Sequence, residues 1–278
     1  MTSPTVPVSS PAPDPTAAEP PAPRAARTRG PHRVVRVMGT VISIDVRDPH
    51  IGASVVDRVV AHLVDIDRRF STYRAASEVS RLGRGEIDLD DASPDLRYVL
   101  TQCERLRVDS DGAFDVWAHR ADGGLDPSGF VKGWAVEEAV QPLLAAGARD
   151  WAINAGGDVI AHGDATPGQG WKVGIRHPDR SDRVAAVLTV RDLAVATSGA
   201  YERGGHIRDP RARAAATGLA SVTVVGPSLA MADAFATAAF AMGGDGPGWV
   251  TGHPGYGVYA ITDDGRVRWS PDLDRLLA

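Results

Sequence analysis

The sequence predicts an α+β fold in which mixed or antiparallel sheets are flanked by helices. In the first half, several segments repeat apolar residues at helical spacing. In the second half, strands outnumber helices and many connections are short, whereas parallel strands need long crossover connections. The six expected strands there are Trp151–Asn154, Val159–His162, Trp171–Arg176, Ala185–Val190, Leu193–Thr197 and Leu219–Val225.

The remaining elements follow from apolar periodicity and from helix start signals. Ser93 before Pro94 is typical of a helix N-terminus, because serine caps the first amides and proline at the first position loses nothing. Ser228 marks a second start, of an apolar helix within residues 227–243. The others are a strand over Val34–Val46 interrupted by Gly39, and helices over Ile51–Phe70, a short stretch ending at Leu82, Pro94–Asp109 and Phe130–Ala146.

Composition predicts a disordered tail at residues 1–32 and one folded domain at residues 33–278. Nine of the twenty prolines lie within residues 1–31, among few large apolar residues, so this stretch cannot bury enough surface to fold. The tail has no apolar signal core and no lipobox cysteine, and no stretch of the chain is apolar enough for a membrane helix. We therefore expect a cytoplasmic protein without an integral membrane segment.

Charge and cysteine content exclude further classes. The net charge is -5 without a basic stripe, which argues against nucleic acid as a partner. Cys103 is the single cysteine, so neither a disulfide framework nor a cysteine metal cluster can form.

The helix at residues 227–243 is apolar on every face except at Asp233 and Thr237. These two residues are four apart and project from one side of the helix. An unpaired carboxylate among such neighbours would cost several kcal/mol, and two hard oxygen ligands suit Mg2+. The alternative is that Thr237 bonds back to a helix carbonyl and that Asp233 pairs with an arginine.

Three further motifs each allow two interpretations. Asn154-Ala-Gly-Gly-Asp158 joins two strands, either because something approaches the backbone closely or as an ordinary hairpin turn. Asp126 and Lys132 lie at the start of a helix, where a diphosphate would fit, although Asp126 also suits a helix cap. His206, in a polar loop, is either a general base or a surface histidine.

Taken in chain order, these motifs resemble the ApbE family of FAD:protein FMN transferases. The matching segments are Met38-Gly-Thr40, Ser71-Thr-Tyr73 with Ser77–Leu82, Gly112-Ala-Phe-Asp115, Asp126-x-x-Gly-x-x-Lys-Gly133, Asn154-x-Gly-Gly-Asp158, Ser198-Gly199 with Tyr201-Glu202, His206-Ile-x-Asp-Pro210, and Asp233-Ala-x-Ala-Thr237. The chain departs from the family pattern at Gly83, at Ala200 and at Ala212-Arg213.

The resemblance implies an ApbE-like (T-fold-like) single catalytic unit that uses Mg2+ and takes FAD as its substrate. It implies transfer of FMN to a threonine hydroxyl of an acceptor flavoprotein, with release of AMP. The metal ligands are then Asp233, Thr237 and the main-chain oxygen of Gly129, and the catalytic base is His206. The implied FAD contacts are Met38, Tyr73, Ala113, Phe114, Asp115, Asp126, Lys132 and Ile207.

Two other functions use the same residues. Water as the acceptor gives a Mg2+-dependent FAD pyrophosphatase, which needs the same metal and base. A non-catalytic FAD-binding protein would be expected to lack Asp233, Thr237 or His206, and all three are present.

Overall fold

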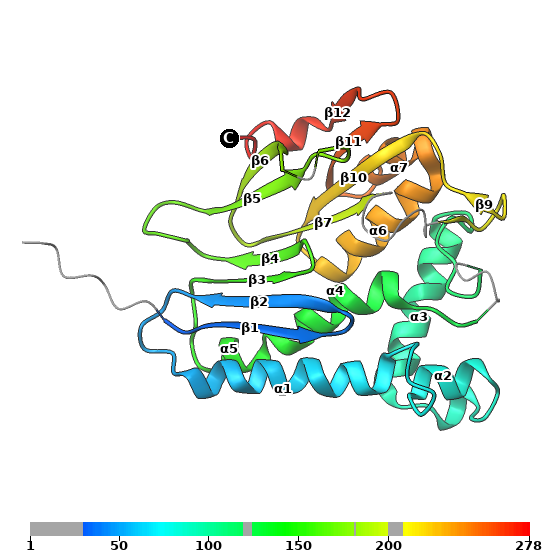
Figure 1. The fold of residues 1–278 in the computed structure, drawn as a ribbon, viewed down its shortest axis with the longest axis horizontal. Helices are drawn as coiled ribbons and strands as arrows, with labels where there is room; N and C mark the ends of the chain where they lie inside the picture. The colour runs from blue at the N-terminus through cyan, green and yellow to red at the C-terminus, as the bar shows by residue number, and fades with distance from the viewer. Residues whose placement is uncertain (1–29, 119–123, 181, 200–207) are drawn as a thin grey trace, which may run out of the picture.

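An eight-stranded antiparallel sheet forms the centre of the molecule (Figure 1). The structure is a computed structural model that describes residues 30–118, 124–180, 182–199 and 208–278. The strands lie in the order β1 (His32–Val37), β2 (Thr40–Val46), β3 (Trp151–Ala155), β4 (Asp158–His162), β7 (Leu193–Gly199), β10 (Leu219–Gly226), β11 (Gly257–Thr262) and β12 (Val267–Trp269). All neighbouring pairs are antiparallel. The predicted α+β class is confirmed.

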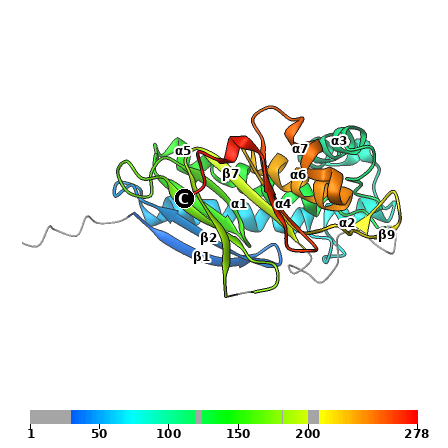
Figure 2. The same ribbon diagram turned by 90° about the horizontal axis from the view of Figure 1, so that it is seen from above.

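Helices cover one face of this sheet. Alternate residues of each strand point to opposite faces, and in β11 Val258 and Ala260 pack into the core shared with the helices. The helices are α1 (Ala53–Phe70), α2 (Glu78–Gly83), α3 (Pro94–Asp109), α4 (Ser128–Ala139), α5 (Gln141–Ala145), α6 (Leu229–Met242) and α7 (Gly246–Thr251). Both ribbon views place α2, α3, α6 and α7 toward the same end of the molecule (Figures 1 and 2).

A β-hairpin covers the other face. It consists of β5 (Trp171–Arg176) and β6 (Val184–Val190), which pair with each other. Its apolar side packs in a second core with Tyr259 and Ile261 of β11 and with Leu273 near the C-terminus. The sheet therefore lies between a layer of helices and a smaller β layer (Figure 1). Among the described residues, no helix has the length and apolar character needed to cross a membrane.

The helix starts read from the sequence are confirmed. Ser93 Oγ accepts a hydrogen bond from Leu96 N at 3.2 Å, and Ser228 Oγ accepts one from Met231 N at the same distance. Each serine thus satisfies one of the amides that a helix N-terminus leaves without an internal partner.

Two predicted elements are each divided in the structure. Val34–Val46 is not one interrupted strand but the hairpin β1–β2, because Met38 (φ 56°) and Gly39 (φ 70°) both adopt the left-handed conformation that a tight two-residue turn requires. Phe130–Ala146 is not one helix but α4 and α5, which meet at Val140. Pro142 has no amide with which to continue the hydrogen-bond pattern of α4.

Some elements were not anticipated from the sequence. They are β8 (Arg208–Asp209), β9 (Ala214–Ala215), α7, β11, β12 and the 3-10 turns Leu89–Asp91, Gly243–Asp245 and Pro271–Leu273.

Two strand turns meet at one end of the sheet. Gly156, between β3 and β4, donates its amide to Val41 O at 3.0 Å. A Cβ on Gly156 would lie 2.3 Å from Thr40 Oγ1, so only glycine allows this approach. The Gly-Gly motif is therefore a hairpin turn, and the group that approaches it closely is Thr40. Asp158 follows this turn directly and begins β4.

Candidate functional site

Asp233 and Thr237 lie on the buried helix α6, as predicted. Their exposed fractions are 3% and 8%, and most other residues of α6 are buried apolar ones. In α3 the hydroxyl of Thr101 donates back to Arg97 O at 2.8 Å. Within the described part of the chain, no comparable bond joins the Thr237 hydroxyl to its own helix.

Gly129 of α4 lies directly against Thr237. A Cβ on Gly129 would stand 3.2 Å from Thr237 Oγ1 and 3.3 Å from Phe114 Cε2. An added Cβ would therefore be in tight contact with both side chains. The absence of a side chain thus brings the main chain of α4 close to the Thr237 hydroxyl and the buried ring of Phe114.

The ammonium group of Lys132, on α4, contacts one carboxylate on β4 and one on α6. Its Nζ lies 2.5 Å from Asp158 Oδ2 and 3.5 Å from Asp233 Oδ1. Asp158 is 1% exposed, and its Oδ1 also accepts the amide of Thr197 at 3.0 Å. The ammonium group thus lies between two buried carboxylates, and buried charges need such compensation.

Asp158 is the site residue that the sequence interpretation missed. The motif Asn154–Asp158 was recognised as a turn or a point of close approach, but its carboxylate was not assigned to the site. The available signal was an acidic residue directly after two glycines and before an apolar strand. Its partner Lys132 belongs to another motif, and no spacing rule connects the two.

The oxygen donors on these parts of α4 and α6 are of the kinds that suit a magnesium ion. Asp233 offers a carboxylate, Thr237 a hydroxyl and Gly129 a carbonyl, and hard oxygen donors of this kind are those that Mg2+ prefers. Across the described residues, no group of three or more His, Cys, Asp or Glu side chains could hold a metal ion. A metal at α4 and α6 would therefore combine one carboxylate with neutral oxygens, which leaves positions for water and phosphate.

The implied FAD contacts next to α4 form a connected segment. Phe114 and Ala113 are fully buried, and Phe114 N donates to Ser110 Oγ at 2.9 Å. Asp126 N donates to Val116 O at 2.7 Å, which ties the segment to the start of α4. The carboxylate of Asp126 accepts the amide of Ser128, the first residue of α4, at 3.1 Å. The N-cap of α4 is Pro127, not Asp126.

Asp115 and Met38 hold local backbone structure. Asp115 Oδ1 accepts the amide of Trp117 at 2.8 Å. Met38 lies in the left-handed turn between β1 and β2, partly buried against the main core. Tyr73 differs from both, because it is 86% exposed on the loop between α1 and α2.

His206 and Ile207 lie outside the described residues. The segment that follows them is placed beside the Gly112 loop, because a Cβ on Gly112 would lie 3.7 Å from Arg211 Cγ. Hydrogen bonds from Arg211 to Asp209, at 2.9 and 3.0 Å, lower the pKa of the Asp209 carboxyl. Asp209 is thus held as a weakly basic carboxylate, which makes it a poor substitute for a histidine base.

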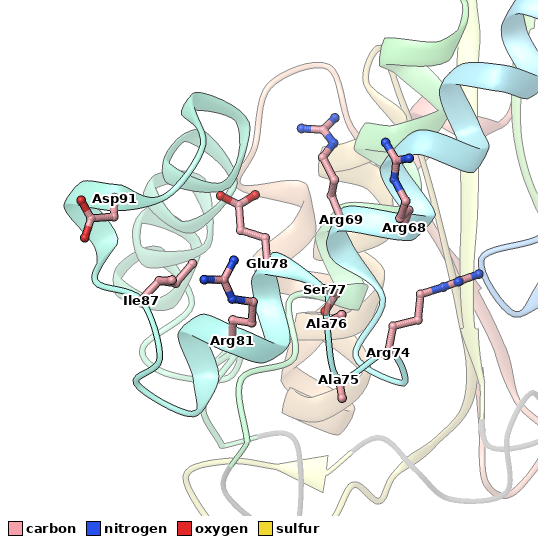
Figure 3. A pocket seen from close by; sticks show the side chains of 10 residues that line it. All are labelled: Arg68, Arg69, Arg74, Ala75, Ala76, Ser77, Glu78, Arg81, Ile87 and Asp91. Atoms are coloured by element: carbon pink, nitrogen blue, oxygen red, sulfur yellow. The ribbon is translucent and has the colours of Figure 1, made fainter.

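A separate pocket, here called the arginine pocket, opens between α1, α2 and the loop joining them (Figure 3). It contains none of the implied metal ligands. Its arginines pair with nearby acids: Arg69 with Asp95 at 2.7 Å, and Arg74 with Asp67 at 3.1 Å. Much of its charge is therefore already compensated by the protein. Its lining residues are Arg68, Arg69, Arg74, Ala75, Ala76, Ser77, Glu78, Arg81, Ile87 and Asp91.

The fold and the buried Asp233 and Thr237 side chains on α6 can be compared with those of known proteins. The ApbE family model matches residues 38–122 and 118–260. The chain therefore belongs to the ApbE family.

Curated relatives in this family are named FAD:protein FMN transferase. The relative from Haemophilus influenzae is 25% identical over 76% of this chain and 80% of its own length. The relative from Treponema pallidum is 35% identical over 64% of this chain and 56% of its own length. A relative from Rhodobacter capsulatus is 38% identical over 54% of this chain, but the match spans only 30% of that protein.

The fold is shared with solved structures. The flavin transferase ApbE from Vibrio cholerae superposes with a TM-score of 0.77 at 23% identity, over 88% of this chain and 98% of that one. The ApbE protein from Thermotoga maritima gives the same TM-score at 22% identity. These likenesses support the three-layer architecture described above.

Proposed function

We propose that the chain transfers FMN from FAD to a threonine hydroxyl of an acceptor protein in a Mg2+-dependent reaction that releases AMP. One observation carries the proposal: the Thr237 hydroxyl of α6 lies against Gly129 of α4, and one turn away the buried Asp233 carboxylate lies 3.5 Å from Lys132 Nζ. The names of the curated relatives support the flavin substrate.

Asp233, Thr237 and the Gly129 carbonyl would hold the metal ion. Bound there, Mg2+ would neutralise charge on the FAD diphosphate and on the AMP leaving group. The residues do not need to move far to bind, since α4 and α6 already contact each other. This pre-organisation is what a reaction governed by positioning and charge requires.

The remaining residues would position the reactants and move one proton. Lys132, fixed by Asp158, would place a positive charge beside the phosphates. The threonine oxygen would form a bond to the FMN phosphorus while the bond from that phosphorus to the bridging oxygen of AMP breaks. His206 would accept the proton of the attacking hydroxyl, and AMP would leave with the bridging oxygen.

The test is incubation with FAD, Mg2+ and a candidate acceptor protein, followed by mass spectrometry of the acceptor and of the nucleotides. The matched control is the same acceptor with its threonine changed to alanine. We expect covalent FMN and AMP in equal amounts with the threonine acceptor. FMN and AMP without labelled acceptor would instead indicate a pyrophosphatase, and FAD binding without turnover would indicate a binding protein.

A variant of His206 separates catalysis from binding. His206→Asn removes the base but leaves α4 and α6 intact, so FAD and Mg2+ binding should persist. The rate should fall about 100-fold or more, the usual contribution of a positioned base. An unchanged kcat would contradict the assignment.

A further inference from the structure

Helices α4 and α6 meet along one line of residues, which we call the α4–α6 seam. Gly129, Gly133 and Glu137 of α4 are spaced four residues apart and therefore lie on one face. Leu229, Asp233 and Thr237 form the matching row on α6. The two rows run antiparallel: Gly129 meets Thr237, Gly133 meets Leu229 and Glu137 meets Leu229. The implied metal ligands thus occupy one end of the seam.

The middle of the seam has no room for a side chain. A Cβ on Gly133 would lie 2.4 Å from Leu229 O and 2.7 Å from Ala230 Cα. These are backbone atoms, which cannot rotate away. The two helix backbones therefore touch at Gly133, one turn from Gly129 along α4.

The far end of the seam is fixed by the carboxylate of Glu137. Glu137 Oε1 accepts the amide of Leu229 in a short hydrogen bond and lies 3.4 Å from the amide of Ala230. These are the first amides of α6, which have no acceptor inside their own helix. The helix dipole also favours negative charge at this position. Ser228 caps the next turn through Met231 N, so a residue of α4 complements the cap that α6 provides itself.

The contact between Glu137 and the first amides of α6 ties the N-terminus of α6 to one position along the axis of α4. A helix rises 1.5 Å per residue, so Asp233 and Thr237 lie about 6 and 12 Å beyond Leu229. A helix shifts as a unit, and a displacement of its N-terminus would move both oxygen ligands relative to Gly129 and Lys132. The separation of 3.5 Å between Lys132 Nζ and Asp233 Oδ1 leaves little tolerance for such a shift.

We propose that Glu137 is a positioning residue for the metal site: by binding the first amides of α6, it sets the register of Asp233 and Thr237 against Gly129 and Lys132. The inference rests on the proposed function, because it assumes that these oxygens bind Mg2+. It predicts that loss of Glu137 weakens metal binding beyond any effect of reduced stability.

A second glutamate provides a matched control. Glu78 of α2 accepts the amide and the hydroxyl of Ser93, the N-cap of α3, with 2.7 Å between Glu78 Oε2 and Ser93 Oγ. It is also a carboxylate that binds the start of a neighbouring helix. However, α3 carries no implied metal ligand, so Glu78→Ala should reduce stability without affecting the metal.

The experiment measures binding of Mn2+, as a spectroscopic substitute for Mg2+, to the full chain saturated with FAD. Wild type, Glu137→Ala, Glu137→Gln, Glu137→Asp and Glu78→Ala are compared by electron paramagnetic resonance, and the Tm of each is recorded without metal. We expect Glu137→Ala and Glu137→Asp to weaken Mn2+ binding about 10-fold or more, as loss of a supporting contact typically does. Glu137→Gln, which keeps the acceptor oxygen, should restore most of the affinity.

The possible results distinguish the positioning role of Glu137 from the metal assignment on which it rests. If wild type binds no Mn2+ in the presence of FAD, the metal assignment itself is wrong and the inference is wrong with it. If wild type binds Mn2+ and the Glu137 variants bind equally well, the metal assignment stands and the positioning role is refuted. If Glu137→Ala does not fold, Glu137→Asp and Glu137→Gln decide, because both keep a polar group at the position.

Discussion

The α4–α6 seam and the arginine pocket both carry charged side chains, but their environments are opposite. At the seam, Asp233 and Asp158 are nearly fully buried and share Lys132. In the arginine pocket, Arg68 is 71% exposed, and its pairing with Asp65 lies within one turn of α1. Exposed ion pairs contribute little and are screened by salt, whereas buried carboxylates must be compensated. Burial of charge, rather than the amount of charge, therefore distinguishes the proposed site from the arginine pocket.

The largest expected difference between the two regions is in activity. Asp233→Ala removes the charged member of the proposed metal ligands and should abolish flavin transfer at saturating Mg2+. Its fold should persist, because α6 is held by apolar packing and Lys132 keeps its contact with Asp158. Arg68→Ala, the matched change in the arginine pocket, should keep near wild-type activity and lose at most about 1 kcal/mol of stability. Transfer rates and Tm values of both variants check this, and an active Asp233→Ala would contradict the metal assignment.

The next expected effect is on stability. Gly133→Ala places a methyl group against the backbone of Leu229 and Ala230, and overpacking of this kind typically costs about 1–3 kcal/mol. Gly248→Ala in α7 is the matched control, because nothing lies within 4 Å of its added Cβ. Alanine should stabilise α7 slightly there. Chemical denaturation measures both changes, and a Gly133→Ala protein as stable as wild type would show that the helices can separate.

A smaller effect is expected in the pH dependence of stability. Burial raises the pKa of Glu137 above its ordinary value, although hydrogen bonds from Ser228, Leu229 and Ala230 oppose this. A raised pKa in the folded state favours the protonated acid. The contribution to stability is therefore complete below the unfolded pKa and is lost as pH rises through the folded one.

The comparison that detects this effect is between wild type and Glu137→Gln, which cannot ionise. Free energies of unfolding measured from pH 4 to pH 8 should show wild type losing stability relative to Glu137→Gln as pH increases. Beside the arginine pocket, the hydrogen bond from Arg84 lowers the pKa of Glu86. The pH dependence that Glu86 gives to stability therefore has the opposite sign, because its contribution is lost as pH falls. A constant difference between the two proteins would mean that Glu137 is as well solvated as an exposed glutamate.

The smallest expected effect concerns Cys103, on the buried face of α3. Burial raises the pKa of its thiol to about 12, so almost no reactive thiolate exists near neutral pH. The native protein at pH 8 should not react with a disulfide reagent over minutes, whereas the denatured protein should react with one thiol. Rapid native labelling would show that α3 opens locally.

Local signals in the sequence predict the helix starts and the buried polar pair on α6. Ser93 and Ser228 cap the helices expected of them, since capping depends on neighbours within one turn. Asp233 and Thr237 were identified because they interrupt an apolar helix. The turn at Met38 was not anticipated, because a non-glycine residue seldom adopts a positive φ.

Contacts between distant segments could not be predicted from the sequence alone. Lys132 pairs with Asp158, and Glu137 binds the amide of Leu229 across two helices. No local pattern encodes either contact, since both depend on how α4 packs against the sheet and against α6. The α4–α6 seam can be recognised only from the packing of the two helices, which brings residues spaced by four on one helix against those on the other.

The most direct test of the account is the position of a metal ion in crystals grown with Mn2+ and FAD. We expect an anomalous peak within about 2.1 Å of the Asp233 carboxylate and the Thr237 hydroxyl, the distance typical of small divalent cations. The carbonyl of Gly129 should complete the protein ligands. A peak elsewhere, or FAD bound with no metal at α6, would contradict the assignment of Asp233 and Thr237 as metal ligands.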